Sequence, residues 1–162
     1  MRIKRTISIS EEYEKIAIEL AGPEKKDKLF DSYRSLLIFA AFLGLKEGKK
    51  KTYTKKSKAI SDIKPETFAP DAPRYWGGYP LLIALADKRN YEALRDTVEE
   101  KEDYISIFET YANGGLEIIS DWLILYGDDR PMETILKGLQ SIDALQTDQT
   151  SPPEIDIEDL IV

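Results

Sequence analysis

The feature that most constrains the fold of this chain is a long apolar stretch of helical period over residues 104–127. Its hydrophobic side chains recur in steps of three or four, at Ile105, Phe108, Ala112, Leu116, Ile119, Leu123 and Tyr126. Such spacing is typical of one face of a helix about seven turns long. Further apolar residues widen that face, so other elements should cover the helix on more than one side. The stretch therefore predicts the central helix of a compact helical domain.

Two adjacent glycines, Gly114 and Gly115, lie in the middle of this predicted helix. Each glycine costs about 1 kcal/mol relative to alanine inside a helix, so their presence needs a physical reason. Either another helix crosses closely there and needs the missing side chains, or the helix kinks or breaks at Asn113. We favour close packing.

The first part of the chain predicts an extended arm followed by two helices. In the N-terminal arm, residues 3–10, isoleucines alternate with polar residues, which is typical of a short strand. Ser10 is expected to cap a first helix that Gly22-Pro23 ends. A second helix starts at Asp31 or Ser32 and ends at Gly48, and its centre, residues 36–45, is apolar all round. Because a membrane span needs roughly 20 apolar residues, we interpret this shorter run as a fully buried core helix.

The remaining elements follow a stretch rich in proline and glycine, residues 59–78, in which Phe68, Tyr75 and Trp76 are expected to anchor the chain to the core. Pro80 fits the start of a helix over residues 81–89, and a short helical piece follows over residues 91–95. Thr97 and Glu100 form a capping box that would begin the central helix. A last helix follows Pro131, with an apolar stripe of Met132, Ile135, Leu136 and Leu139.

These segments predict a mainly α protein: one compact orthogonal helical domain of five or six helices, with the option of a short N-terminal strand. The domain would span residues 1–142. Residues 143–162 contain no basic residue and are expected to form a flexible acidic tail.

The charge of the chain is divided unevenly along its length. The net charge is −7, yet residues 1–58 carry 15 lysines and arginines against 8 acidic residues. Seven lysines fall in one basic loop, residues 46–58. Lysines of this kind can neutralise nucleic-acid phosphates without reading base sequence, and a tyrosine among them can stack on a base. The candidate nucleic-acid-binding residues are Lys49, Lys50, Lys51, Tyr53, Lys55, Lys56 and Lys58. A short lysine run is, more often, a solvated flexible loop that keeps a protein in solution.

The absence of two residue types limits the chemistry that the chain can perform. It contains no cysteine and no histidine, which removes disulfides, thiolate metal sites and every nucleophile activated by histidine. We therefore predict no catalytic residue, no cofactor and no metal site, and a reducing cytoplasm as the setting.

The acidic tail ends in an apolar pattern that suits a protein partner. Ile155, Ile157, Leu160 and Ile161 are the candidate partner-binding residues, because such a segment can add to a sheet edge or fold on a groove. A disordered end is the alternative. The tail could also shield the basic loop of its own chain, since the two are of opposite charge.

The order of these segments, and two stretches in particular, resembles a known family. The stretches are residues 39–44, FAAFLG, and residues 108–116, FETYANGGL. Over roughly residues 1–140 the chain resembles the DNA phosphorothioation-associated proteins, specifically the small family of dnd-system-associated protein 4. The resemblance implies a bacterial accessory protein, beside genes that place sulfur in the DNA backbone or restrict DNA lacking it. It implies no catalytic residue, and both stretches read as structural.

The resemblance and the charge distribution together predict a non-catalytic accessory protein of a modification or restriction system that acts in phage defence. It would contact DNA phosphates through the basic loop, other proteins of the system, or both, and no membrane. One alternative is a protein-only adaptor whose tail docks on a larger helicase or nuclease. Another is a dimeric regulator of the ribbon-helix-helix type, in which Lys4, Thr6 and Ser8 would face bases.

Overall fold

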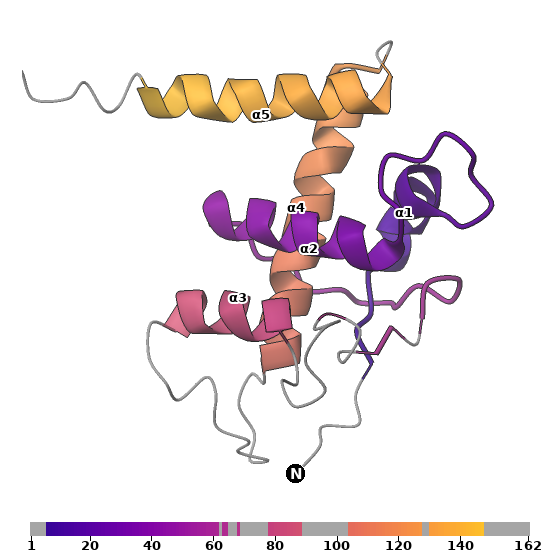
Figure 1. Cartoon of the computed structure of the whole chain (residues 1–162). Helices are drawn as coiled ribbons and strands as arrows, with labels where there is room; N and C mark the ends of the chain where they lie inside the picture. Colours follow the sequence, from indigo (N-terminus) through magenta and orange to yellow (C-terminus); the bar gives the residue numbers. More distant parts are fainter. Residues whose placement is uncertain are drawn as a thin grey trace, which may run out of the picture.

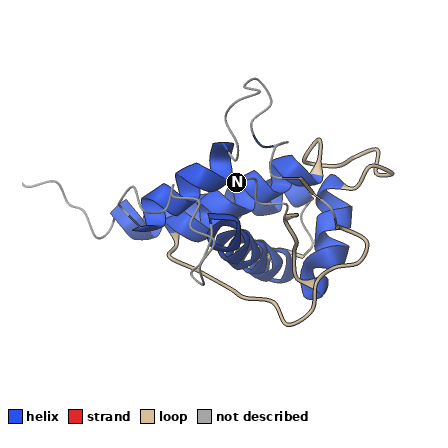
Figure 2. Ribbon diagram, turned by 90° about the horizontal axis from the view of Figure 1, so that it is seen from below, coloured by secondary structure: helices blue, strands red, loops and turns tan. Residues whose placement is uncertain are grey.

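The computed structural model describes residues 6–61, 63–64, 68, 78–88, 104–127 and 130–147. Within these ranges the chain forms five α-helices and one short 3-10 turn, and no part of them is drawn as a strand in Figure 2. The elements are η1 (Glu11–Tyr13), α1 (Glu14–Ala21), α2 (Tyr33–Lys46), α3 (Gly78–Lys88), α4 (Tyr104–Leu125) and α5 (Pro131–Thr147). The prediction of a mainly helical domain is confirmed.

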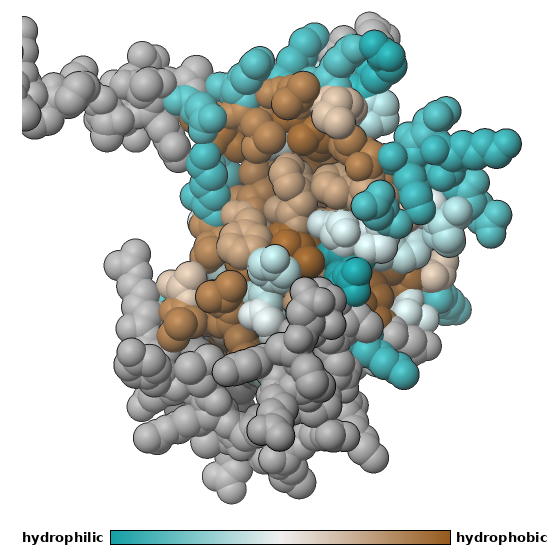
Figure 3. Space-filling view, in the orientation of Figure 1, coloured by the Kyte–Doolittle hydropathy of each residue, from teal (hydrophilic) through white to brown (hydrophobic). Residues whose placement is uncertain are grey.

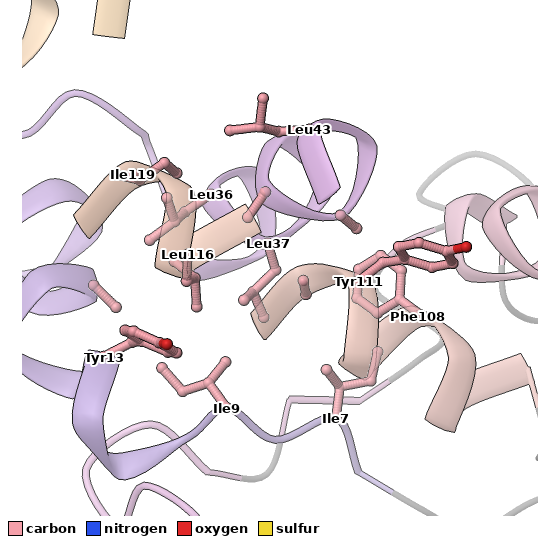
Figure 4. Close-up of a cluster of buried hydrophobic side chains, with 14 of the residues drawn as sticks. Ile7, Ile9, Tyr13, Leu36, Leu37, Leu43, Phe108, Tyr111, Leu116 and Ile119 are labelled. Atoms are coloured by element: carbon pink, nitrogen blue, oxygen red, sulfur yellow. The ribbon is translucent and has the colours of Figure 1, made fainter. Parts of the chain in front are cut away.

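The long helix α4 is the axis of the fold, as its apolar pattern predicted. In Figure 1, α2, α3 and α5 cross α4 at successive heights, and each packs against it. Phe108, Leu116 and Ile119 on α4 are completely buried. Figure 4 shows how the N-terminal part closes this core: Ile7, Ile9 and Tyr13 face Leu36 and Leu37 of α2 and Phe108 and Leu116 of α4.

Helices α2 and α4 approach each other so closely that only small residues fit between them. A Cβ atom built on Gly115 would overlap the backbone carbonyl of Ala40, and one on Gly44 would overlap the carbonyl oxygen of Tyr111. A Cβ on Gly114 would overlap the backbone of Lys49. Since α4 continues unbroken through these residues, close packing is confirmed as the reason for the paired glycines and a break at Asn113 is wrong.

The described part of the N-terminal arm, residues 6–10, is extended and lies against α4. Two isolated bridges, Ile7 with Ile63 and Ser10 with Lys56, take the place of a regular strand. The amide of Ser8 donates to Oε1 of Glu109 and the amide of Ser10 donates to Oδ1 of Asn113, both at 2.8 Å. The two spacings match: acceptors four residues apart on a helix are about 6 Å apart along its axis, and donors two residues apart on an extended chain are about 6.6 Å apart.

This docking removes one requirement of the ribbon-helix-helix alternative. Ser8 is only 5% exposed and its amide is bonded to α4, so its side chain is not available to DNA bases. Lys4, the first of the three residues expected to face bases, lies outside the described residues.

The helix ends agree with the predictions in most places. Gly22 follows the last residue of α1, Ser32 caps α2 by accepting the amide of Ser35, and Gly48 follows α2 with φ at 64°. Ser10 precedes η1, but its hydroxyl makes no capping hydrogen bond to a backbone amide, so that prediction is wrong. Helix α3 begins at Gly78, two positions before the predicted proline start.

Two predicted apolar faces are only partly buried. Phe42 is exposed on α2, so that helix is not buried all round. On α5, Ile135 is buried, but Met132 and Leu136 of the predicted stripe are half exposed. The reason is that the inner side of α5 consists of Thr134, Ile135 and Gly138, which lie toward Trp122 and the end of α4. The neighbouring side of α5, with Met132 and Leu136, therefore faces solvent.

Several predictions fall wholly or partly outside the described residues: the helical piece at 91–95, the capping box at Thr97 and Glu100, and the anchors Tyr75 and Trp76. The third anchor, Phe68, is buried, with its ring 5.2 Å from that of Phe108. Helix α5 continues to Thr147, so the domain boundary predicted after residue 142 falls inside it. In the described part of the chain, no helix combines the length and the apolar content that crossing a bilayer requires.

Candidate functional site

The basic loop is held in place by its own backbone. The amide of Lys49 donates to the carbonyl of Gly44, and the amide of Lys51 donates to the carbonyl of Thr110 on α4. Farther along, the amide of Ser57 donates to Ile9, and the carbonyl of Lys55 accepts the amide of Glu11. The loop is thus hydrogen-bonded to α2, α4, η1 and the N-terminal arm through Lys49, Lys51, Lys55 and Ser57.

Lys51 lies at the centre of a small polar cluster. Its Nζ atom donates to the hydroxyl oxygen of Tyr13 at 2.6 Å and lies 3.1 Å from carboxylate oxygens of both Glu12 and Glu117. The other carboxylate oxygen of Glu117 pairs with Lys49 at 3.0 Å, so Glu117 holds two lysines of the loop.

The electrostatics of this cluster keep Lys51, Glu117 and Tyr13 in their ordinary charge states. The hydrogen bond to Tyr13, helped by those to Glu117 and Glu12, raises the pKa of Lys51 well above its usual range. The bonds from Lys49 and Lys51 lower the pKa of Glu117, and burial raises the pKa of the Tyr13 hydroxyl. A lysine held protonated is a poor general base or nucleophile, so this cluster is suited to holding structure.

The Glu117 pair predicts a pH-dependent contribution to stability. A carboxylate with a lowered folded pKa stabilises the fold above its ordinary pKa, about 4.3, and that contribution disappears as the pH falls through the folded value. We expect Glu117→Gln to lower the free energy of unfolding by about 1 kcal/mol at neutral pH and the difference to close below about pH 4. Urea unfolding across pH 3 to 7 measures it. Glu19→Gln, at the exposed pair with Lys25, is the control and should change the free energy of unfolding by no more than about 0.5 kcal/mol, because exposed ion pairs contribute little. A difference between Glu117→Gln and the parent that persists in acid would contradict the role given to Glu117.

Lys50 also makes its contacts within the protein. Its Nζ atom pairs with Asp87 of α3 at 2.7 Å and lies 5.0 Å from the centre of the Tyr111 ring. The Tyr111 hydroxyl donates to the same carboxylate at 2.6 Å. This arrangement ties the basic loop to α3 and α4 at once.

The far end of the loop faces outward. Lys55 pairs with Glu11 at 2.8 Å, with both side chains largely exposed, and Lys56 lies 5.7 Å from the centre of the Tyr53 ring. Lys58 is exposed, and none of the carboxylates that the structure describes pairs with it or with Lys56. The structure therefore divides the predicted set: Lys49, Lys50 and Lys51 pair with carboxylates of η1, α3 and α4, and Lys55, Lys56 and Lys58 lie on the outward end of the loop.

The residues that sequence reasoning missed form one polar stripe on α4. Glu109, Asn113 and Glu117 follow each other at intervals of four, so they lie on one face of an otherwise apolar helix. Glu109 and Asn113 accept hydrogen bonds from the N-terminal arm, and Glu117 forms an ion pair with the basic loop. The sequence showed these polar residues at helical spacing. It did not show their partners, which lie up to about a hundred residues away along the chain.

The described surface also exposes apolar side chains, all of them large except Ala86, on two pairs of helices. We call Ile124, Leu125, Met132 and Leu136 the α4–α5 corner, and Phe42, Tyr79, Leu82 and Ala86 the α2–α3 surface. Figure 3 shows apolar side chains gathered from beneath α5 across the middle of the molecule to α3. No group of three or more potential metal ligands occurs in the part of the chain that the structure describes. The predicted partner-binding residues of the tail, Ile155, Ile157, Leu160 and Ile161, lie outside it.

Comparison with known proteins identifies one family. The model of DNA sulphur modification system-associated protein 4 matches residues 6–158 of the chain, which is nearly its whole length. No curated protein and no solved structure gave a match.

Proposed function

The chain belongs to the family of DNA sulphur modification system-associated protein 4, and from this membership we propose that it is a non-catalytic accessory protein of such a system. It would act in the cytoplasm, where the DNA is modified or restricted in defence against phage. Its task would be to bind another protein of the system. The absence of cysteine and histidine supports a role without chemistry, since transfer of sulfur commonly uses a cysteine nucleophile.

The observation that carries the proposal is the apolar α4–α5 corner. Ile124 is 79% exposed and Leu125 is 70% exposed, on the last turn of the most buried helix of the fold. Large apolar side chains grouped at a surface with a polar rim are typical of protein interfaces. The rim is mixed in charge: Asp121 and Glu133 are acidic, but Glu133 pairs with Arg130 at 2.8 Å and the exposed Lys137 adjoins Leu136. The partner that fits is therefore a protein with an apolar groove bordered by polar residues of both charges.

A second candidate function, contact with DNA phosphates, rests on the outward end of the basic loop. Lys55, Lys56 and Lys58 lie within four positions of each other and are exposed, which suits sequence-independent contact with one phosphate backbone. Lys49, Lys50 and Lys51 contribute less, because they pair with Glu117, Asp87 and Glu12 and are less exposed than Lys55, whose pair with Glu11 lies at the surface.

One pair of variants tests both candidates. The first, Ile124→Lys with Leu136→Lys, places charge in the α4–α5 corner; the second replaces Lys55, Lys56 and Lys58 with glutamine. Each protein encoded by the modification system is tagged and co-expressed in turn, and affinity for a DNA duplex is measured over a range of salt. We expect the corner variant to weaken binding to one system protein at least about tenfold, since losing a central interface anchor costs about 2 kcal/mol or more and tenfold corresponds to about 1.4 kcal/mol.

Matched controls keep these outcomes distinct. Glu19→Lys adds a positive charge at an exposed site on α1 and should leave protein binding unchanged.

If DNA is a ligand, the lysine variant lowers the slope of log affinity against log salt by about 3, one for each lost contact. The control for it replaces Lys25, Lys26 and Lys28, which form another lysine group, and an equal loss there would contradict a specific role of the basic loop. Equal protein binding by the corner variant and the parent would refute the partner proposal.

A further inference from the structure

The α2–α3 surface includes the outer side of α3, which is apolar although the inner side of α3 already packs against α4. On α3, Ile83 and Ala84 are buried toward α4, whereas Tyr79, Leu82 and Ala86 share the opposite, exposed side at helical spacing. Phe42 of α2 joins them, because its ring lies edge-on to that of Tyr79 at 6.1 Å. A helix that is apolar on both sides is expected to be covered on both.

The end of α5 contacts the C-terminal end of α2, which lies between α5 and α3 in Figure 1. Lys46, one turn after Phe42 on α2, pairs with Asp143 of α5 at 2.9 Å. Figure 1 shows the last turns of α5 and α2 and the helix α3 on the same side of the molecule. The chain therefore leaves α5 at Thr147, only one turn beyond its contact with the C-terminal end of α2.

The segment that follows α5 has the length and the chemistry to reach this surface. Residues 148–154 can span up to roughly 23 Å when extended, and Pro152-Pro153 favours an extended backbone. Next come Ile155, Ile157, Leu160, Ile161 and Val162, interleaved with Asp156, Glu158 and Asp159. The nearby cations, Lys46 and Lys50, are each more than two-fifths exposed despite their partners, so they can meet these carboxylates.

We propose that the α2–α3 surface is the docking site of the chain's own C-terminal segment, residues 155–162. The apolar side chains of the segment cover Phe42, Tyr79 and Leu82, and its carboxylates face Lys46 and Lys50. This site is distinct from the α4–α5 corner and does not depend on the proposed function. It differs from the adaptor interpretation of the tail in assigning the segment a surface within the same molecule.

The test uses a spin label on the full chain. Because the chain has no cysteine, Val162→Cys gives one labelling site, and NMR line broadening reports which amides the label approaches. We expect the amide signals around Phe42 and Leu82 to lose intensity, and to recover it when Ile155→Ser and Leu160→Ser are added. Leu82→Lys should restore them as well, without loss of fold because this side chain is more than half exposed. Ile124→Lys, in the other apolar surface, is the control and should leave the broadening unchanged.

A second sample distinguishes docking of the segment within one molecule from docking on a second copy of the chain. Spin-labelled chains without isotope are mixed with isotope-labelled chains without the spin label. Absence of broadening in the mixture, together with broadening in the first sample, supports docking within one molecule. Broadening in the mixture means that the segment binds a second copy, and no broadening in either sample means that it does not bind this surface; either result overturns the proposal.

Discussion

Replacing Gly115 with alanine is expected to lower the free energy of unfolding by about 3 kcal/mol, the upper part of the range for overpacking a core. The new Cβ atom would overlap the backbone of Ala40, and backbone cannot rotate aside as a side chain can. Helices α2 and α4 would have to separate where both are most buried. The intrinsic helix preference of alanine, worth about 1 kcal/mol, is too small to offset this loss.

Urea unfolding followed by helical circular dichroism measures the effect. Gly127→Ala is the matched control, because its Cβ would meet nothing nearer than the carbonyl oxygen of Leu123 at 3.3 Å. That variant should change stability by no more than about 0.5 kcal/mol, as exposed positions usually do. A similar stability for the two variants would contradict the close approach of α2 and α4.

Replacing Asn113 with alanine is expected to cost about 3 kcal/mol as well, for a different reason. Asn113 is fully buried, and its side chain accepts the amide of Ser10 and donates to the carbonyl of Glu109. Alanine would leave the amide of Ser10 buried without its acceptor, which costs about 1–3 kcal/mol, and would leave a small cavity besides.

Hydrogen exchange gives this prediction a local readout. The Ser10 amide should be protected in the parent chain and exchange much faster in the variant, while amides in the middle of α2 keep most of their protection. Thr110→Ala is the control on the same helix, since the Thr110 hydroxyl donates to Ile107 and accepts no amide of the arm. Unchanged protection of Ser10 in the Asn113 variant would show that the arm is held by other contacts.

The sequence was sufficient for the features that depend on neighbours along the chain. The period of residues 104–127 identified α4, because burial of one helical face leaves its mark within a few residues. The paired glycines indicated close packing for the same reason. The ends of α1 and α2 followed from local capping chemistry at Gly22, Ser32 and Gly48.

The sequence did not reveal the features that depend on partners far away along the chain. The lysines of the basic loop read as one uniform group, and only the fold brings Glu117 and Asp87 to three of them. The apolar period of α5 was visible as well, but period alone does not say which way a helix turns. Met132 and Leu136 face outward, whereas Thr134 between them is completely buried against the end of α4.

The contacts of residues 108–116 account for much of what this stretch contains. Phe108 fills the core, Tyr111 binds Asp87, and Gly114 and Gly115 admit the backbones of the basic loop and α2. Glu109 and Asn113 hold the N-terminal arm. Each of these roles is architectural.

The docking of the arm on α4 has a consequence for the order in which the chain reaches its final form. Ser8 and Ser10 leave the ribosome long before their acceptors, which lie 101 and 103 positions later. At about 5–20 residues per second, the arm waits roughly 5–20 seconds for α4 to be synthesised. Until then Ile7 and Ile9 cannot pack against α4, so a part of the chain made well before α4 is among the last to find its place, and a chaperone that binds apolar segments has its best opportunity there.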